Sequence, residues 1–414
     1  MKMKRYLSAG LVLTALGLLW GTTAPALAAP KSSCISCHEK VTPAVVKQFA
    51  AGKMGRTLDC SACHGTEHRS EQDVAKAKLP SPDTCAQCHP KKVEEFRAGK
   101  HALAWAAMKA MPMLSHQPLP MKGDGLKGCS GCHTIGDKAA SEITRYGSGA
   151  CDSCHTRHTF SVQEARDPRT CRTCHMGFDH PQWEMWQTSK HGTIWEIETG
   201  RQTTAGSERA PTCQTCHLPG GNHAVMTAWG FLALRVPEDD PEWWKDRVTI
   251  LQALGVLDGQ GNPTERLAVV QGGKVARLSK EEFAQQRARM LETCTKCHSR
   301  RYAEENLAAG DQMVREADRI FAQAIRTVKS LYDQGLLKKP AGWTFAPDLL
   351  QFYEAKTPIE QDLYLIFMEY RMRTFQGAFH ANPDYAHWYG WAKMKEAAVR
   401  IEDAAAALRA GQKR

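Results

Sequence analysis

Cys34-Ile-Ser-Cys37-His38 is the first of eight C-x-x-C-H pentapeptides, and this repeated pattern decides the fold of the chain. The eight copies use all 16 cysteines of the 414-residue sequence, so no cysteine is left for another role. The two thiols of such a motif can form thioethers to a porphyrin, and the histidine that follows can bind the iron from one side. The other seven copies are formed by Cys60, Cys63 and His64; Cys85, Cys88 and His89; Cys129, Cys132 and His133; Cys151, Cys154 and His155; Cys171, Cys174 and His175; Cys213, Cys216 and His217; and Cys294, Cys297 and His298.

Two other roles for paired cysteines fit this pattern less well. A disulfide framework would suit an exported chain, but it would not need a histidine after every second cysteine. Zinc ribbons pair C-x-x-C units without that histidine. The sequence therefore predicts eight covalently attached c-type haems, each with its iron bound by a motif histidine. Because haem propionates would offset the formal net charge of +10, that charge does not indicate a nucleic-acid partner.

Residues 1–28 have the order of a secretory signal peptide. A basic start is followed by an apolar run over residues 7–20 and by Ala26-Leu-Ala28. The apolar run is shorter than the roughly 20 residues that cross a bilayer. We therefore expect cleavage of the signal peptide near Ala29 and export to the periplasm, with an uncleaved anchor as the alternative.

The spacing of the motifs divides the rest of the chain. Seven motifs fall within residues 34–217, so little chain remains between them for an apolar core, and porphyrin faces would supply the buried surface. Beyond His298, apolar residues recur at spacings of three and four, which predicts three long amphipathic helices separated near residues 339–342 and 382–383. We expect a mostly α protein with a haem-packed body, residues 29–298, and a C-terminal bundle of long helices, residues 299–414.

Nine histidines lie outside the motifs and are candidates for the second side of the irons. A low-spin haem iron needs a second axial ligand, whereas a haem that binds substrate keeps that position open. Seven bis-histidine haems and one open haem would need seven second ligands. The nine available histidines are close to that number, and one or two of them would be ordinary surface histidines. The candidate ligands are His68, His101, His116, His158, His191, His223, His380 and His387, and the ninth histidine is His180.

Local spacing limits how two of these histidines can pair. His68 follows the motif residue His64 by four positions, and His158 follows His155 by three. Residues so spaced lie on one face of a helix, so neither pair can straddle one porphyrin. We therefore expect His68 and His158 to bind the irons of neighbouring haems, which would tie successive haems into a chain.

The stretch CRTCHMGFDHPQWEMWQTSKHG, residues 171–192, resembles the octahaem hydroxylamine oxidoreductase family. The resemblance extends over nearly the whole chain, with eight motifs in a compatible order, the pair Asp179-His180 after the sixth motif, and the C-terminal segment NPDYAHWY at residues 382–389. Octahaem nitrite reductases and tetrathionate reductases use a lysine at the catalytic iron, and the nitrite reductases carry it as C-x-x-C-K. That motif does not occur in this sequence.

The resemblance implies an active site at the fourth motif, Cys129, Cys132 and His133. There the distal side would be open, and Asp179 and His180 would accept or deliver protons. For these two residues the alternative is a helix N-cap beside an ordinary haem ligand. The implied activity is redox conversion of small nitrogen compounds, most directly hydroxylamine oxidation, with seven haems as the electron path. The alternatives are reduction of nitrite or nitric oxide, and a non-catalytic electron-transfer protein in which His180 is a ligand.

The resemblance also bears on assembly and on the direction of the reaction. It implies a homotrimer and an electron-carrier cytochrome or quinone-linked redox partner. In the oxidising members of the family, a tyrosine from a neighbouring subunit is bonded to the catalytic porphyrin. Tyr385 and Tyr389 are the candidates, with Tyr385 favoured because it follows the Asn-Pro-Asp turn, and interface packing is the alternative. No tyrosine occurs between Tyr146 and Tyr302, where oxidising members place a further pocket tyrosine.

Overall fold

The computed structural model describes residues 32–110, 129–200, 209–225, 239–272 and 279–412. The expected signal peptide and His116 lie outside these ranges. Within them the secondary structure is helical, and the only β contact is an isolated bridge between Leu257 and Pro263. This confirms the mostly α fold. No helix of the described residues has the length and apolar character needed to cross a membrane.

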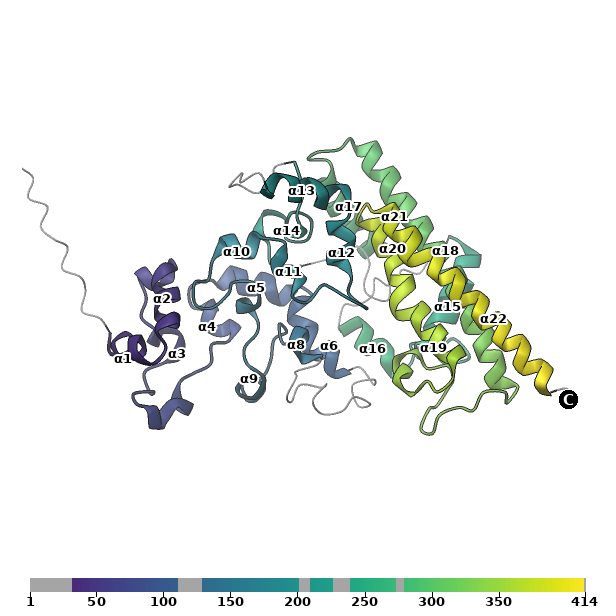
Figure 1. Ribbon diagram of the computed structural model, residues 1–414, viewed down its shortest axis with the longest axis horizontal. Helices are drawn as coiled ribbons and strands as arrows, with labels where there is room; N and C mark the ends of the chain where they lie inside the picture. Colours follow the sequence, from purple (N-terminus) through teal and green to yellow (C-terminus); the bar gives the residue numbers. More distant parts are fainter. Residues whose placement is uncertain (1–31, 111–128, 201–208, 226–238, 273–278, 413–414) are drawn as a thin grey trace, which may run out of the picture.

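Short helices carry seven of the eight motifs and form the body of the molecule (Figure 1). Proline often opens these helices, since its fixed φ suits a first helical turn and its missing N–H is not needed there. They are α1 (Ser33–Val41), α2 (Pro43–Ala51), η1 (Met54–Arg56), α3 (Ser61–His64), η2 (Glu71–Lys76), α4 (Pro82–Ala86), α5 (Pro90–Ala98), η3 (His101–Leu103), α6 (Ala104–Ala110), α8 (Ser130–His133), α9 (Ala140–Tyr146), η5 (Cys151–Ser153), α10 (Val162–Arg166), α11 (Arg169–Arg172), α12 (Gln182–Gln187), α13 (Lys190–Gly200), α14 (Cys213–His217) and η6 (Pro219–Gly221).

Longer helices follow and include the three that the apolar spacing predicts. The first is α18, the second is continuous through α19, a π-helical turn and α20, and the third runs from α21 through another π-helical turn into α22 (Figure 1). The helices of this part are α15 (Pro241–Ala253), α16 (Glu265–Gly272), α17 (Lys280–Cys294), α18 (Arg300–Asp333), η7 (Leu349–Glu354), α19 (Pro358–Leu365), η8 (Ile366–Tyr370), α20 (Arg371–Phe379), α21 (Pro383–Tyr385), η9 (Ala386–Trp391) and α22 (Ala392–Gln412).

The main apolar core lies among the long helices. One face of α18 is fully buried there, including Ala317, Phe321 and Val328, and it packs against α19, α20 and α22. Helix α15 contributes Ile250 to the same core, although α15 precedes residue 299. Residue 298 therefore marks the last haem motif and not the edge of the apolar core.

The apolar clusters of the body are small by comparison. Trp183, Trp186, Trp195 and Ala210 form one of them, and Phe96, Ala102 and Ala150 form another. Clusters of three or four buried residues cannot supply the buried area that a region of this size needs. The body therefore depends on buried surface that its own side chains do not provide.

Asp318 is a polar exception in the core of the long helices. Its side chain is fully buried, and its two oxygens accept hydrogen bonds from Arg371 at 2.9 Å and from the indole of Trp243 at 2.7 Å, while Arg247 forms an ion pair with it at 2.9 Å. The helical pattern of the sequence gives no sign of this cluster, because an aspartate on an apolar face breaks the pattern. The carboxylate compensates two guanidinium groups that are only 1% exposed.

Replacing Asp318 by alanine is expected to destabilise the fold by about 3–5 kcal/mol, because it leaves two buried cations without their carboxylate. The measurement is the denaturant midpoint followed by far-UV circular dichroism. The matched control is Asp333→Ala on the same helix, where the ion pair with Lys329 is exposed and should contribute about 1 kcal/mol or less. Equal shifts for the two variants would contradict this role of Asp318.

Candidate functional site

Each motif closes a helical turn that brings its cysteines and histidine together. In six motifs the histidine N–H donates to the carbonyl of the first cysteine at 2.9–3.1 Å, as from His133 to Cys129. Positions three and four apart lie on one face of such a turn, so both thiols and the imidazole can face one flat group. This is the arrangement that covalent haem attachment requires.

Six motif histidines face a histidine from another part of the chain. A metal–imidazole bond is about 2 Å long and the ring centre lies about 1 Å further, so two imidazoles on opposite sides of one metal ion have centres about 6 Å apart. The observed ring-centre separations are 6.0–6.4 Å. The pairs, motif residue first, are His38 with His68, His64 with His158, His155 with His223, His175 with His101, His217 with His380, and His298 with His191.

Two of these pairs agree with the limit set by local spacing. His68 does not face its neighbour His64 but the first motif's His38, and His158 faces His64 and not His155. Each of the two therefore connects its own segment to the haem position of an earlier motif.

Hydrogen bonds fix which nitrogen of these rings is available to a metal ion. The Nδ1 atoms of His64, His133, His223 and His380 lie 2.7–2.9 Å from backbone carbonyl oxygens. A carbonyl only accepts, so Nδ1 carries the proton and Nε2 of the neutral ring keeps its lone pair. Ordinary haem and metal ligation by histidine uses this tautomer, held by an outer hydrogen bond.

Burial keeps several of the rings in the neutral form. It lowers the pKa of His175 to about 3, and that of His101 and His380 to about 4. The neighbouring histidine charges act in the same direction on all three. Since a metal ion binds only the neutral imidazole, these residues are in the form that ligation needs.

The fourth motif differs from these six. His133 donates from Nδ1 to the carbonyl of Ala104 at 2.8 Å, and no histidine of the described residues forms a 6 Å pair with it or with His89 of the third motif. Burial lowers the pKa of His133, and the charges of Asp179 and His180 also act on it. The two residues that the resemblance implies are therefore close to the fourth motif.

Asp179 and His180 form a pair of their own. Asp179 Oδ1 lies 3.1 Å from His180 Nδ1, and the side chains are 45% and 35% exposed. Burial raises the pKa of Asp179, but the hydrogen bond and charge of His180 outweigh it, and the net pKa lies below the usual value. Helix α12 begins at Gln182 with Pro181 in the N-cap position, so Asp179 is not the cap of that helix.

His180 also lies 6.2 Å from His175 of the sixth motif, measured between ring centres. His175 therefore has two histidine neighbours, because His101 lies at 6.1 Å. The pKa of His101 is lowered strongly by burial, whereas His180 is partly exposed and bonded to Asp179. This favours His101 as the partner of His175 and leaves His180 between the fourth and sixth motifs.

The motifs follow one another closely in space. The sulfur atoms of Cys132 and Cys174 are in contact, which joins the fourth motif to the sixth. Similar contacts join the third motif to the fifth and the sixth to the seventh, and cysteines also lie near one another between the first and second, second and third, fifth and sixth, and seventh and eighth motifs. The eight motifs thus form one connected set, in which the sixth motif adjoins the fourth, the fifth and the seventh.

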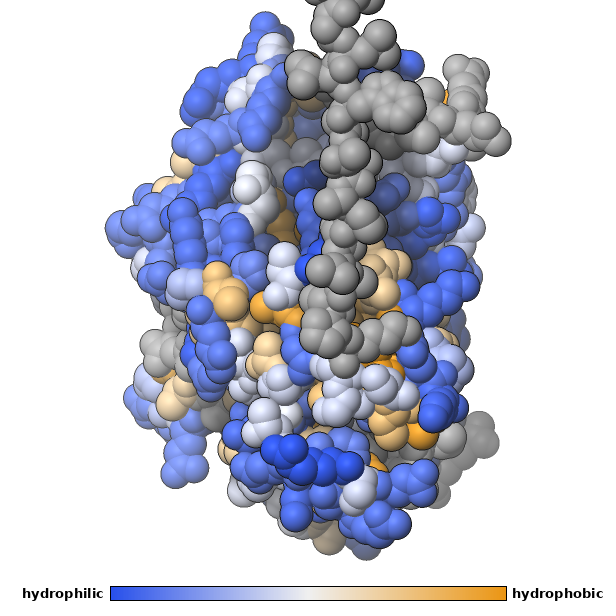
Figure 2. Space-filling model, turned by 90° about the vertical axis from the view of Figure 1, so that its left-hand side faces the viewer, coloured by the Kyte–Doolittle hydropathy of each residue, from blue (hydrophilic) through white to orange (hydrophobic). Residues whose placement is uncertain are grey.

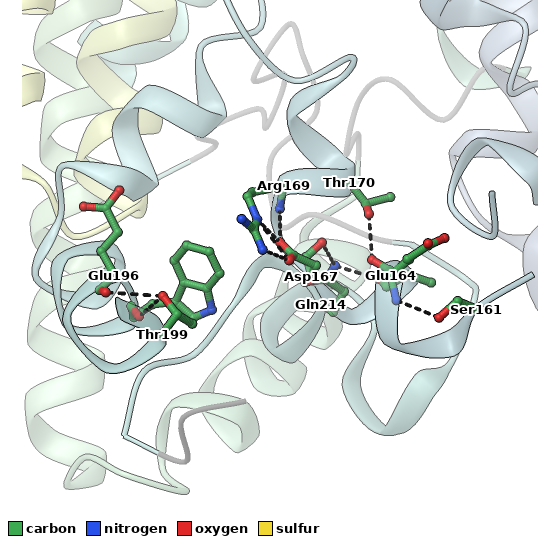
Figure 3. Close-up of polar contacts among 10 residues, drawn as sticks. Ser161, Glu164, Asp167, Arg169, Thr170, Glu196, Thr199 and Gln214 are labelled. Carbon is green, nitrogen blue, oxygen red and sulfur yellow. Dashed lines mark hydrogen bonds and ion pairs between the residues drawn. The ribbon is translucent and has the colours of Figure 1, made fainter. Parts of the chain in front are cut away.

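A residue inside the seventh motif holds the segment before the sixth (Figure 3). Gln214 Nε2 donates to the carbonyls of Ala165 and Asp167 at 2.9 and 3.0 Å. The Asp167 carboxylate pairs with Arg169, which opens α11. These contacts fix the two motifs relative to each other.

The two C-terminal tyrosine candidates differ in their exposure to solvent. Tyr385 is 7% exposed and Tyr389 is 56% exposed, with ring centres 5.0 Å apart. His387 is exposed and packs against Trp388 and Trp391, and the structure brings it to no motif histidine of the described residues. The structure therefore does not support His387 as a haem ligand.

Three polar residues near the site carry no signal in the sequence pattern. Gln182 and Gln376 are hydrogen-bonded to each other at 2.8 Å, and Gln182 also contacts His175. Asn382 donates to Met185 and Thr188 at the turn after α12. Gln182 lies 7 residues from His175, and Gln376 and Asn382 each lie 194 residues from their partners Gln182 and Thr188, so spacing within the sequence could not reveal these contacts.

Apolar side chains remain exposed at the N-terminal end of the molecule. Figure 2 views this end and shows apolar residues gathered in the middle of a mostly hydrophilic face. Val41, Leu58, Val74 and Leu79 in this part of the chain are 38–61% exposed. Exposed apolar residues beside haem motifs, together with the small clusters of the body, fit a protein whose haems supply the missing buried surface.

Comparison with known proteins agrees with this geometry. The family model described as "Seven times multi-haem cytochrome CxxCH" matches residues 30–235 and 265–342. The chain belongs to this multihaem cytochrome family. It therefore carries covalently bound c-type haems, and the paired imidazoles and motif turns described above fit them.

A curated relative of this multihaem cytochrome is the "Probable nitrite reductase-hydroxylamine oxidoreductase fusion protein" of Kuenenia stuttgartiensis. The two are 25% identical over 464 aligned residues, which cover 91% of this chain and 51% of the relative. The chain thus spans about half the length of the curated relative that it matches.

Two solved structures share the fold. One is a chain of the Kuenenia stuttgartiensis "reducing HAO-like protein complex", with a TM-score of 0.68, 24% identity, and coverage of 92% of this chain and 86% of the other. The second is described as a "Hypothetical multiheme protein", with a TM-score of 0.67, 20% identity, and coverage of 92% and 96%. At these identities the likeness concerns the fold.

Proposed function

We propose that this multihaem cytochrome is an oxidoreductase that converts small nitrogen compounds at its fourth motif. The observation that carries the proposal is the position of Asp179 and His180 near His133, a motif histidine that forms no 6 Å histidine pair among the described residues. The name of the curated relative, a nitrite reductase-hydroxylamine oxidoreductase fusion, supports the substrate class.

The residues around the fourth motif have separable roles in this proposal. Cys129, Cys132 and His133 would hold the haem, which supplies an iron that exchanges electrons and binds the substrate. Asp179 accepts from His180 Nδ1 and so holds the ring in one orientation, leaving Nε2 as the atom that exchanges protons with the substrate. Reduction of nitrite to nitric oxide consumes two protons with one electron and releases water, so such a proton donor is needed.

The remaining motifs serve electron transfer. The histidine pairs provide two imidazoles for each of six irons, which suits low-spin haems that exchange electrons without binding substrate. The contact between Cys132 and Cys174 makes the sixth motif the neighbour through which electrons reach the fourth. We propose eight haems in total, one for each motif.

The proposal also covers the location of the protein, its domains and its partners. We propose export to the periplasm with removal of residues 1–28, an octahaem body over 29–298 and the bundle over 299–414. The redox partner would be an electron-carrier cytochrome or a quinone-linked protein, and three copies would assemble, as the resemblance implies. The solved relative that is described as part of a complex supports a protein partner.

We propose reduction, of nitrite or nitric oxide, as the favoured direction. Tyr385, the preferred candidate for a cross-link in the oxidising direction, is buried in its own chain. The further pocket tyrosine of oxidising members has no counterpart between Tyr146 and Tyr302. The word "reducing" in the description of the solved relative agrees with this direction. Hydroxylamine oxidation is the second candidate, which the exposed Tyr389 favours because an exposed ring can reach a neighbouring copy.

The first test is electron paramagnetic resonance of the oxidised protein. The proposal predicts a high-spin signal that nitrite and hydroxylamine both change, from the haem at the fourth motif. A spectrum that is entirely low-spin and ignores both compounds would contradict the proposal and favour a pure electron-transfer protein with His180 as a ligand.

The direction is tested with Tyr389→Phe. The matched control is Tyr385→Phe, because Tyr385 lies four residues earlier and is buried in its own chain. In the reductive case neither change alters the haem spectrum, and nitrite reduction with a reduced dye stays within about twofold of wild type, because neither phenol hydroxyl takes part in the reaction. Loss of a tyrosine-linked haem peptide together with hydroxylamine oxidation in Tyr389→Phe alone would overturn the reductive direction. The measurements are the intact mass of the haem peptides and the rates of nitrite reduction and hydroxylamine oxidation.

A further inference from the structure

Two glutamines connect the sixth motif to helix α20. His175 Nδ1 lies 3.2 Å from Gln182 Oε1, and Gln182 Nε2 lies 2.8 Å from Gln376 Oε1. The backbone carbonyl of Gln376 accepts from His380 Nδ1 at 2.7 Å. His175 is the motif ligand of the sixth haem position, and His380 faces His217 of the seventh. One residue of α20 is thus linked to an imidazole of two consecutive haem positions.

The direction of each hydrogen bond follows from the chemistry of the ring. If His175 Nε2 binds iron, Nδ1 of the neutral ring carries the proton and must donate, so the atom of Gln182 that faces it is the carbonyl Oε1. The amide nitrogen of Gln182 then faces Gln376 and must find an acceptor there, which Gln376 Oε1 provides. The remaining amide nitrogen of Gln376 is directed at the sulfur of Met372 at 3.9 Å. Each nitrogen in this series thus donates to at least one acceptor.

The side-chain amide at His175 differs from the partners of the other motif histidines with described contacts. His64 and His133 donate to backbone carbonyls, and His38 contacts the hydroxyl of Thr42. A backbone carbonyl is fixed by the fold, whereas an amide side chain needs a second residue to hold its orientation. Gln376 supplies that second contact from a helix that is far away in the sequence.

We propose that Gln182 is a positioning residue that sets the reduction potential of the sixth haem through His175. In this proposal Gln376 acts through Gln182, by holding its amide with the carbonyl toward the imidazole. An outer acceptor makes a ligating histidine more basic, which stabilises the oxidised iron, so the strength of this hydrogen bond tunes the potential. The proposal rests on the proposed function only in requiring haems at the sixth and seventh motifs.

The test is a spectroelectrochemical titration of the whole haem-loaded protein, with the components fitted as one-electron steps. Gln182→Leu removes the acceptor, so one component should shift to a higher potential. Gln182→Glu provides a stronger, charged acceptor, so the same component should shift to a lower potential. The expected size is about a tenfold change in the reduction equilibrium, which corresponds to about 59 mV for one electron.

The role of Gln376 is tested by combining substitutions. Gln376→Leu alone should shift the same component upward by less than Gln182→Leu, because the Gln182 carbonyl can still accept. In the Gln182→Leu background, Gln376→Leu should add no further shift of that component, since its path to His175 is already removed. The matched control is Gln187→Leu, at the end of the same helix, where the amide donates to Glu196 at the surface and no shift is expected.

Opposite shifts for leucine and glutamate at position 182 support the proposal, because a merely structural disturbance would move the potential in one direction or broaden all components. Shifts of the same sign, no shift, or an equal shift in Gln187→Leu would overturn it. The outcome is independent of substrate turnover. A protein without nitrite or hydroxylamine chemistry could still show the two opposite shifts, and an active enzyme without them would contradict the positioning role alone.

Discussion

Replacing Asp179 by asparagine is expected to lower nitrite reduction about 10²–10⁴-fold, the usual contribution of a positioned acid–base group. Asparagine keeps the volume of the side chain but carries neither the charge nor a titrating proton. Its amide can also donate to His180, which would favour the opposite ring tautomer and turn the wrong nitrogen toward the substrate. The helix that follows should be unaffected, because Pro181 and not Asp179 occupies its N-cap position.

The matched control for Asp179→Asn is Asp73→Asn. Asp73 Oδ1 lies 2.9 Å from His68 Nδ1, so it forms the same kind of carboxylate–imidazole pair, but at the first motif. Turnover with a small reduced dye as donor, measured with haem content and visible spectra, separates the two sites. Full activity in Asp179→Asn, or an equal loss in both variants, would contradict a catalytic role for Asp179.

Local patterns predicted the features that depend on neighbouring residues. A C-x-x-C-H motif forms its turn through a hydrogen bond four residues apart, and the long helices follow from apolar spacing within each segment. Met313, Ala317 and Ile320 follow the apolar spacing, yet α18 buries Val314 more completely than Met313, and it carries Asp318 on the buried face. Those differences arise because the helices that pack against α18 determine which residues at the edge of its apolar face are buried.

The pairing of the histidines depends on the fold as a whole. The sequence restricts His68 and His158 through their distance from the nearest motif, but it says nothing about His101 or His380. His380 comes from α20 in the region of long helices and faces a motif of the body, and no periodic pattern connects two such positions. The packing of α20 against α12 is one of the long-range contacts that connect the long helices to the body.

The tyrosines show how one tertiary contact changes an expectation. The sequence favoured Tyr385 over Tyr389 as the cross-link candidate because Tyr385 directly follows the Asn-Pro-Asp turn. In the structure the side chain of Asn382 accepts from Tyr385 N and donates to Met185 and Thr188, which pulls the turn onto the end of α12. Tyr385 is consequently turned inward, and Tyr389, one helical turn later, is on the surface.

Replacing His380 by alanine is expected to convert one low-spin haem into a high-spin haem. His380 is half-buried and faces His217 with ring centres 6.4 Å apart, and desolvation lowers its pKa to about 4, so the neutral ring is available at Nε2. Without it the seventh haem would keep only His217 as an axial ligand. Electron paramagnetic resonance should show one additional high-spin component, and added imidazole should restore the low-spin spectrum by filling the space left by the side chain.

The matched substitution is His387→Ala, because the sequence alone treats His380 and His387 as equal candidates. His387 packs between Trp388 and Trp391 at the surface, so its removal should leave all haem spectra unchanged. A new high-spin component in His387→Ala, or none in His380→Ala, would contradict the assigned pairing. The different expectations arise from the hydrogen bond of His380 Nδ1 to the Gln376 carbonyl, which directs its other nitrogen toward His217. His387 is exposed and its ring packs against Trp388 and Trp391, so ligation follows from the direction of the ring and not from the presence of a histidine.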